Sequence, residues 1–195
     1  ARNYWLLLAS LLFYAWGEGA MVWVMLGSIA LNYVVGLRME ATREPSKRKS
    51  WLWLAIVGNL GLLLVYKYLG FVVQNLNHLF FGLDLPLIPA VRLDLPIGIS
   101  FFTFQALSYV IDLYRERHQA QRNPFSLALY ISLFPQLIAG PIVRYQDLYQ
   151  QLQSRVLSFQ GFTMGTQRFL IGLAKKVLIA DQVALFVDKI FLLPT

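Results

Sequence analysis

Residues 134–144 read Phe-Pro-Gln-Leu-Ile-Ala-Gly-Pro-Ile-Val-Arg and interrupt apolar sequence with two prolines, a glycine and an arginine. The backbone groups freed by Pro135 and Pro141 need hydrogen-bond partners, and non-helical backbone at membrane depth is tolerated only inside protein or beside a water-filled cavity. An ionisable side chain such as that of Arg144 is costly there and marks a functional hypothesis. This stretch therefore predicts a broken membrane segment that faces protein or water rather than lipid.

The composition around this stretch is typical of a membrane protein. Of 195 residues, 57% are hydrophobic and 14% are charged, whereas globular proteins carry about 25% charged residues. The absence of cysteine excludes disulfides and thiolate metal sites. The net charge of +7 is assigned to loops, and we expect no nucleic-acid partner because no nucleic-acid-binding motif is present. Because the chain starts with Ala1 rather than Met, we expect a fragment or a chain that has lost its start.

Four apolar segments are predicted to cross the membrane, because a span needs about 20 mostly apolar residues. These segments comprise residues 4–16, 20–37, 51–68 and 97–114. The first is short enough to be the remnant of a span, and Gly17-Glu18-Gly19 predicts a turn after it. Residues 124–139 are also apolar but number only sixteen, fewer than the ~17–25 of a full crossing. They predict a re-entrant segment or, alternatively, a short span that ends in an ordinary loop.

Charged loops orient the predicted spans, because cytoplasmic loops carry an excess of lysine and arginine. The loop 38–50 has five basic and two acidic residues, a net charge of +3. The loop 115–122 has three basic and one acidic residue, a net charge of +2. Two predicted spans separate these loops, so we expect both of them, and the N-terminus, on the cytoplasmic side.

Residues 71–95 form the predicted outer segment between these two loops. They carry Arg92 against Asp84 and Asp94, a net charge of −1. The prolines at positions 86, 89 and 96 exclude a long helix in this region. We therefore expect irregular backbone that faces outward.

The predicted span 97–114 carries polar residues on one face. Gln105, Ser108, Asp112 and Arg115 are spaced three, four and three residues apart, which places them on one side of a helix. Gly98 falls on the same side and should let another backbone approach. The stripe predicts a face that lines a cavity. The alternatives are an ion pair between Asp112 and Arg115 at the membrane boundary and an interhelical hydrogen bond from Gln105.

Residues 162–191 predict a long helix with a second polar stripe. Four polar residues recur every seven positions, and two aspartates repeat on a neighbouring strip: Arg168, Lys175, Gln182, Lys189, Asp181 and Asp188. Lys176 lies about 100° from the stripe, given 3.6 residues per turn. The helix is expected either to lie in the membrane interface with its charges toward water or to line a water-filled funnel.

Known catalytic and metal-binding motifs are absent from the 195 residues, including a nucleophile elbow, a phosphate-binding loop and H-E-x-x-H. His78 and His118 fall in predicted loops on opposite membrane faces and are interpreted as solvated residues. They cannot build a metal site together. Arg144 could offer its planar donor fork to a phosphate or carboxylate.

Taken together, several motifs resemble the N-terminal half of a bacterial membrane-bound O-acyltransferase, above all the alginate O-acetyltransferase membrane subunits. The motifs that carry this resemblance, by order and spacing, are Leu-Pro-Ile-Gly-Ile-Ser-Phe-Phe-Thr-Phe-Gln at 95–105, Ser-Tyr-Val-Ile-Asp-Leu-Tyr-Arg at 108–115, the stretch 134–144, and Lys-Lys-Val-Leu-Ile-Ala-Asp at 175–181. The resemblance extends from about residue 3 to residue 184.

The resemblance implies an all-α polytopic fold in one membrane domain, residues 1–195. This would be a partial ring of transmembrane helices with broken and amphipathic helices, in the bacterial inner membrane. It implies a cytoplasmic acyl donor, acetyl-CoA or an acyl carrier protein, and an exported polysaccharide such as alginate as acceptor. Periplasmic acetyl-transfer proteins, membrane lipids and a missing C-terminal half would be its partners. No covalently bound cofactor and no metal are expected.

The resemblance also assigns roles to individual residues. Gln105, Ser108 and Tyr109 would line the chamber, and Gly140 and Pro141 would shape it. The remaining candidates, which would hold the anionic part of the donor or contribute polar groups, are Arg144, Lys175, Lys176, Asp112, Arg115 and Asp181. The family's catalytic histidine lies in a Trp-His-Gly type motif that this sequence lacks, so no catalytic residue is expected in this chain and the chain alone should be inactive.

Two other functions remain open at this point. Broken helices and intramembrane charges also mark transport pathways, so the chain could be a transporter or channel subunit. It could also be a non-catalytic membrane scaffold that docks partners.

Overall fold

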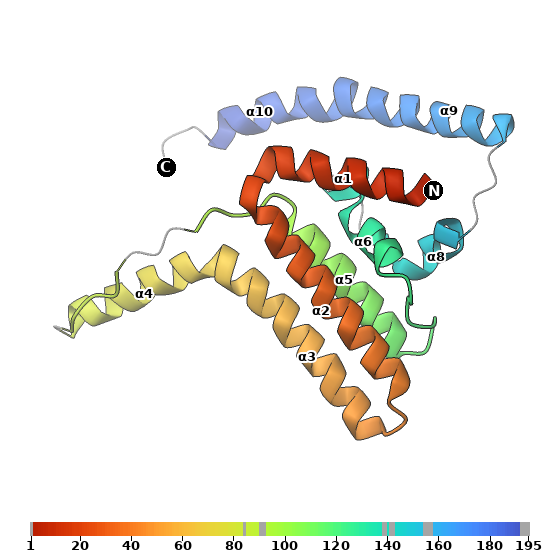
Figure 1. Ribbon diagram of the computed structural model, residues 1–195. Coiled ribbons are helices and arrows are strands. Elements are labelled where there is room, and N and C mark those ends of the chain that lie inside the picture. The colour runs from red at the N-terminus through yellow and green to blue at the C-terminus, as the bar shows by residue number, and fades with distance from the viewer. Residues whose placement is uncertain are drawn as a thin grey trace. The chain divides into compact units, whose positions relative to one another are not determined.

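The computed structural model describes residues 2–83, 85–89, 93–137, 140, 143–153 and 158–191, and the elements in this part of the chain are all helices (Figure 1). They fall into two compact units, Ala1–Gln153 and Ser154–Thr195. The helical content agrees with the prediction of an all-α fold.

The first helical stretch bends near its middle. Helix α1, Arg2–Glu18, passes through a short 3-10 turn, Gly19–Met21, into α2, Val22–Ala41. Gly19 has a φ of 55°, a left-handed conformation that glycine adopts without a steric penalty. Figure 1 shows α1 and α2 diverging from this turn, so they do not pack side by side along their length. The predicted turn is therefore a bend, and the orientation of the N-terminus stays a prediction.

The second helical stretch begins only a few residues after the end of α2. Helix α3, Pro45–Leu63, has proline in its first turn, where the missing N–H costs nothing. It continues through a π-helical turn, Leu64–Tyr68, into α4, Leu69–Gly82. Only Thr42–Glu44 separate it from α2, so the predicted loop 38–50 is wrong in extent, since most of its charged residues lie on helix ends.

Helix α4 also corrects the prediction for residues 71–95. The segment is helical up to Gly82 because its prolines begin only at Pro86. The described residues after Leu83 are non-helical until α5 begins, as the prolines predict. Asp84 and Arg92, on which the predicted charge of this segment rests, lie outside the described residues.

Helices α2, α3 and α5 pack against one another and form the centre of the first unit (Figure 1). Helix α5, Ile99–Tyr114, matches most of the predicted span 97–114 but has 16 residues, a length of about 24 Å. Gly98 precedes it with a φ of 74°, and a Cβ there would lie 2.6 Å from the backbone oxygen of Leu137. The prediction that Gly98 admits a second backbone is confirmed.

Three short helices cover this bundle: α6, Pro124–Ser132; α7, Phe134–Leu137; and α8, Tyr145–Gln153. The side chain of Asn123 caps α6 by accepting from the backbone N–H of Phe125. With nine residues, α6 is about 14 Å long, too short to cross a membrane. Helix α6 packs against α1 and α2, and α8 packs against α5. The apolar stretch 124–139 is thus not one continuous span, and its re-entrant course stays a prediction.

The two basic segments predicted to share one side of the membrane lie in contact. Arg48 forms an ion pair with Glu116, and Arg122 lies 3.8 Å from Glu40. A carboxylate oxygen of Glu40 also accepts from the backbone N–H of Ala120 at 2.8 Å. The structure therefore confirms that both segments lie at the same end of the helical bundle.

A buried polar contact joins α2 to α3. The Asn59 amide donates to Asn32 Oδ1 at 2.8 Å, and the Asn32 amide donates to Asn59 Oδ1 at 3.0 Å. The Ser28 hydroxyl donates to the same Asn59 oxygen at 3.2 Å. All three residues are buried, so this cluster fixes how the two helices meet.

The second unit contains one long helical stretch, as predicted for residues 162–191. It comprises α9, Phe159–Lys175, a π-helical turn, Lys176–Ala180, and α10, Asp181–Phe191. Ser158 caps its start by accepting from the backbone N–H of Gly161. Its side chains are exposed almost throughout. Within this unit, therefore, no other helix of the described residues packs against either its polar or its apolar face.

Candidate functional site

The polar face predicted on α5 is buried rather than open. Gln105 is 1% exposed, Asp112 is 4% exposed and Tyr109 is fully buried, while Ser108 is half-buried. Helices α6 and α8 pack against this helix. The structure thus brings the predicted residues together on one face, and that face is covered by the short helices.

Gln105 meets the segment that interrupts the apolar sequence. Its amide donates to the side-chain oxygen of Gln136, on α7, at 3.1 Å. The alternative prediction of a hydrogen bond between helices is therefore confirmed. Gln105 Oε1 and the hydroxyl of Thr103 are buried without a partner in the described part of the chain. Buried unpartnered polar atoms are uncommon and call for an explanation.

Tyr130, on α6, holds the backbone that leads to Arg144. Its hydroxyl donates to the carbonyl of Val143 at 2.8 Å and lies 3.5 Å from the carbonyl of Gln105. Ser108 lies beside the same hydroxyl. Tyr130 was not among the predicted site residues, because nothing in the spacing of residues 105 and 130 shows that they meet.

The structure describes part of the Gly140–Pro141 break in the stretch 134–144. A Cβ on Gly140 would lie 2.8 Å from the Cα of Gln136, so a close backbone approach requires glycine there. Its role in shaping a chamber stays a prediction. Pro141 lies outside the described residues. The Arg144 side chain is exposed, one residue beyond the carbonyl that Tyr130 holds. Whether Arg144 binds an anion stays a prediction.

The predicted ion pair of Asp112 with Arg115 is wrong, because Asp112 pairs with Arg117 at 3.2 Å. The cause is the way α5 ends. Glu116 has a φ of 58°, and the backbone N–H groups of Glu116 and Arg117 donate to the carbonyls of Leu113 and Asp112. This is a Schellman motif, which turns the chain back so that Arg117 lies over Asp112. Arg115 is exposed, and Asp112 Oδ2 has no partner among the described residues.

An aromatic cluster closes the charged end of α5. The ring of His118 stacks on Tyr109 with centroids 5.4 Å apart, and Tyr145 meets both rings at 4.7 and 4.9 Å. The Gln121 side chain donates to the Tyr145 hydroxyl at 2.8 Å. Burial raises the pKa of Tyr145 above its ordinary value, and this hydrogen bond partly offsets the shift. Burial thus favours the neutral phenol, while the hydrogen bond from Gln121 fixes its position.

The interpretation of His118 as a solvated loop residue is therefore wrong. Its ring is packed between tyrosines, and Nε2 is buried, because the Schellman turn directs residues 117–121 back over the end of α5. His78 is exposed as predicted, but it lies on α4 rather than in a loop.

The remaining predicted site residues lie in the second unit. Lys175 is exposed, and Lys176 pairs with Asp181 at 2.8 Å within the helix. Their proposed part in a chamber stays a prediction. No group of three potential metal ligands occurs in the described ranges.

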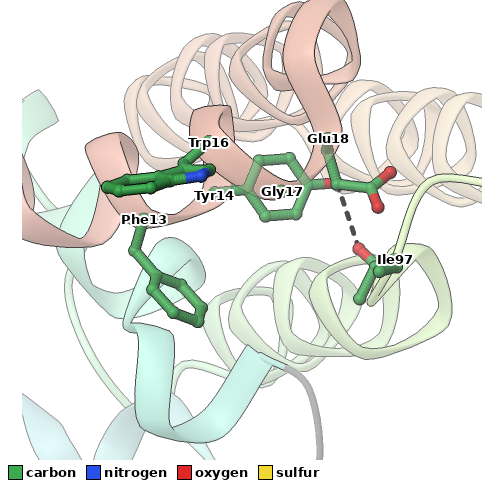
Figure 2. Close-up of a pocket in the computed structure, with 6 residues that line it drawn as sticks. All are labelled: Phe13, Tyr14, Trp16, Gly17, Glu18 and Ile97. Atoms are coloured by element: carbon green, nitrogen blue, oxygen red, sulfur yellow. Dashed lines mark hydrogen bonds between the residues drawn. The ribbon is translucent and has the colours of Figure 1, made fainter.

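An apolar pocket of about 400 Å³ lies at the bend between α1 and α2. Figure 2 shows Phe13, Tyr14 and Trp16 lining it together with Ile97. The Tyr14 hydroxyl donates to the Ile97 carbonyl at 3.0 Å, the contact drawn as a dashed line in Figure 2. This hydrogen bond ties the bend to the segment that leads into α5.

The fold defines an all-α membrane protein. Two helical stretches, Arg2–Ala41 and Pro45–Gly82, are long and apolar enough to cross a membrane. Large side chains on them, such as Trp23 and Trp53, point outward and are 72% and 55% exposed. An outward apolar surface on helices of this length suits contact with lipid.

Comparison with known proteins identifies the relatives of this chain. It is 38% identical over 193 residues to the probable alginate O-acetylase AlgI of Pseudomonas aeruginosa, covering 98% of this chain and 37% of that protein. It is 39% identical over 194 residues to the protein of the same name from Azotobacter vinelandii, covering 98% and 39%. It is 36% identical over 211 residues to the peptidoglycan O-acetyltransferase of Helicobacter pylori, covering 94% and 39%.

The chain is thus homologous to these acetyltransferases along almost its whole length, which confirms the resemblance to them inferred from the motifs. It spans well under half the length of these relatives. No protein-family profile matches the chain. No solved structure matches it either.

Proposed function

We propose that this chain is part of a membrane O-acetyltransferase that moves an acetyl group from a cytoplasmic donor to hydroxyl groups of an exported polysaccharide, such as alginate or another cell-surface glycan. The observation that carries this proposal is the identity of 38% over 98% of the chain to a protein named alginate O-acetylase. The peptidoglycan O-acetyltransferase, 36% identical, supports the same reaction on a different glycan.

The reaction sets clear demands on the site. The oxygen of the acceptor hydroxyl forms a bond to the acetyl carbonyl carbon, the carbon–sulfur bond of the thioester donor breaks, and the hydroxyl proton passes to the leaving thiolate. A base with a pKa near 7 speeds this proton transfer. The resemblance places that base on a histidine outside these 195 residues. We therefore assign positioning, and not proton transfer, to this chain.

The braced face of α5 is suited to such positioning. Gln105 Oε1 and Asp112 Oδ2 are buried acceptors without partners in the described chain, so they can orient hydroxyl groups. Tyr130 fixes the carbonyl of Val143, and this anchors the backbone beside the exposed Arg144. Its guanidinium could then bind the anionic part of acetyl-CoA or of an acyl carrier protein.

We also propose a bacterial inner-membrane location, with the joined basic segments toward the cytoplasm and periplasmic acetyl-transfer proteins on the other side. The basic excess at one end of the bundle supports this orientation. Because the chain has no cysteine, single variants Lys47→Cys and Gln119→Cys can be labelled with an impermeant maleimide. Both should react only in inside-out vesicles, and labelling of either one from the outside would contradict the orientation.

A segment exchange tests the function. In a Pseudomonas aeruginosa strain, this chain would replace the matching part of AlgI, and acetyl groups per uronate residue would be measured by NMR. The exchange should restore acetylation. A chimaera present in membranes at the normal level but without acetylation would overturn the proposed function.

Two variants of this chimaera test the role of Arg144. Arg144→Ala should lower acetylation by about tenfold, since charge-assisted hydrogen bonds contribute about 1.5–3 kcal/mol. Arg38→Ala, which also removes an exposed arginine of the first unit, should leave acetylation unchanged. Equal acetylation in Arg144→Ala and the unsubstituted chimaera would refute the anion-binding role.

A further inference from the structure

A second cavity lies at the charged end of the bundle, beside the C-terminal end of α5. Its volume is about 500 Å³, within the range of small-molecule sites. Side chains from the end of α2, the α2–α3 connection, the start of α3, the end of α5 and the turn after it line the cavity. The lining residues used below are Glu40, Arg43, Arg48, Glu116 and His118.

Arg48 lines this cavity, and its side chain has one unused donor. Its Nη1 group pairs with Glu116, and its guanidinium lies over the ring of Tyr114 at 5.8 Å. The Nε–H group is buried and has no partner in the described part of the chain. A guanidinium held at two sides with one free N–H is a preorganised donor for an oxyanion.

His118 contributes a second unused polar atom. Its Nδ1 lies 2.9 Å from the carbonyl of Gln119, which places the proton on Nδ1 as donor. Nε2 is then free for another hydrogen bond, and it too is buried without a partner among the described residues. Stacking on Tyr109 holds the ring in place.

The two carboxylates of the cavity are already matched. Glu116 pairs with Arg48, and Glu40 is engaged by Arg122 and by the N–H of Ala120. Arg43 is exposed and takes part in none of the ion pairs of the described residues. The surrounding segments 38–50 and 115–122 have net charges of +3 and +2. The four charged lining residues therefore sum to zero, but Arg43 is left without an ion pair because Arg48 and Arg122 pair with the two carboxylates. Beside it are two buried polar atoms without partners in the described part of the chain.

We propose that this cavity is a binding site for a phosphate group. Arg43 and the Nε–H of Arg48 donate to phosphate oxygens, and Nε2 of His118 accepts a third hydrogen bond from the P–OH group of a singly protonated phosphate. Three such groups from separate chain segments suit a tetrahedral anion better than a planar carboxylate. The phosphate belongs either to a soluble phosphorylated ligand or to an anionic lipid headgroup. The site is independent of the acetyl-transfer proposal, because it uses none of the residues assigned to that reaction.

The test uses the purified 195-residue chain in maltoside micelles, which contain no phosphate. In one arm, coenzyme A and inorganic phosphate are titrated calorimetrically, with acetate as the carboxylate control. In the other arm, phosphatidic acid is added and bound lipid is counted by native mass spectrometry. Saturable binding in the first arm supports a soluble ligand, and retention of one lipid in the second supports a headgroup. Acetate binding as tightly as phosphate would overturn the choice of anion.

Charge variants separate a built site from general attraction. Arg43→Gln and Arg48→Gln should each weaken phosphate or phosphatidic acid binding about tenfold. Lys49→Gln removes the same charge from an exposed neighbour that does not line the cavity, and binding should change less than twofold. Circular dichroism checks folding, and if Arg48→Gln is unfolded, the exposed Arg43 decides. No binding of any probe, or an equal loss in Lys49→Gln, would overturn the proposal.

Discussion

Polar residues occur on apolar helices in both units of this protein, but the two units treat them in opposite ways. In the first unit, Asn32, Asn59 and Gln105 are buried and hydrogen-bonded to other helices. In the second unit, the stripe of charged residues along α9 and α10 is exposed. The stripe was visible in the sequence through its seven-residue repeat, whereas the buried asparagines carried no repeat.

The difference shows that a periodic pattern indicates which face of a helix is polar but does not indicate which other segment contacts that face. A stripe tells which side of a helix is polar, and the same pattern suits water, a membrane interface or a cavity. A lone buried amide gives no pattern, yet it is energetically expensive unless another helix satisfies it. The buried contact between Asn32 and Asn59 is therefore one that a periodic pattern cannot reveal.

The largest difference in stability between the two units is expected when a glycine in each unit is replaced by alanine. Gly98→Ala should destabilise the chain by roughly 3 kcal/mol, because a left-handed backbone costs a non-glycine residue about 1–3 kcal/mol and the new Cβ meets the Leu137 backbone oxygen. Gly165→Ala, on α9, meets nothing within 4 Å and should stabilise its helix by about 0.5–1 kcal/mol. Unfolding in mixed micelles, followed by circular dichroism, measures both. Similar values for the two variants would contradict the close packing at Gly98.

The amide contact between α2 and α3 should give the next largest effect. Asn32→Leu or Asn59→Leu leaves the other amide buried without its partner and should cost about 1–2 kcal/mol, near the upper end for hydrogen bonds between membrane helices. The double variant should recover part of this loss, because neither amide is then left unpaired. Gln182→Leu, in the exposed stripe, is the matched control and should change stability by less than 0.5 kcal/mol. Strict additivity of the two asparagine variants would contradict a direct contact.

The smallest change in stability is expected at two ion pairs that have the same sequence separation, which makes them a direct comparison of the two units. Asp112 pairs with Arg117 and Asp181 pairs with Lys176, each five residues apart, but Asp112 is buried and Asp181 is partly exposed. Asp112→Asn should destabilise by about 1–2 kcal/mol through loss of a charge-assisted hydrogen bond. Asp181→Asn should change stability by less than about 0.5 kcal/mol, as exposed pairs do. Equal losses of stability for Asp112→Asn and Asp181→Asn in the same unfolding assay would contradict the view that polar residues are buried in the first unit and exposed in the second.

Much of the helical framework could be predicted from residues close in sequence. The segments 20–37 and 51–68 are helical, and so is 97–114 from Ile99 onward. The bend at Gly19 and the irregular backbone after Gly82 follow from glycine and proline. The boundaries of some segments were predicted wrongly because a rule about local composition was applied to too many residues. The loop 38–50 was drawn too long because charge was taken for irregularity, although helix ends carry charged residues readily.

The candidate site could be predicted only in part. One face of α5 was found because Gln105, Ser108 and Asp112 share a helical period. Tyr130 was not found because it is far in sequence from its contacts on that face, 25 residues in the case of Gln105. The partner of Asp112 was assigned to the wrong arginine because the left-handed conformation of Glu116 has no sequence signature such as glycine.

By itself, the sequence determined the class of protein, the positions of most helices and the basic character of one end. These properties depend on composition and on short-range periodicity, which are written along the chain. Only the tertiary structure decided that Asn32 meets Asn59, that Arg117 rather than Arg115 pairs with Asp112, and that His118 is packed rather than solvated. These contacts depend on which helix faces close against each other and on how the chain turns at helix ends, and both are settled by packing.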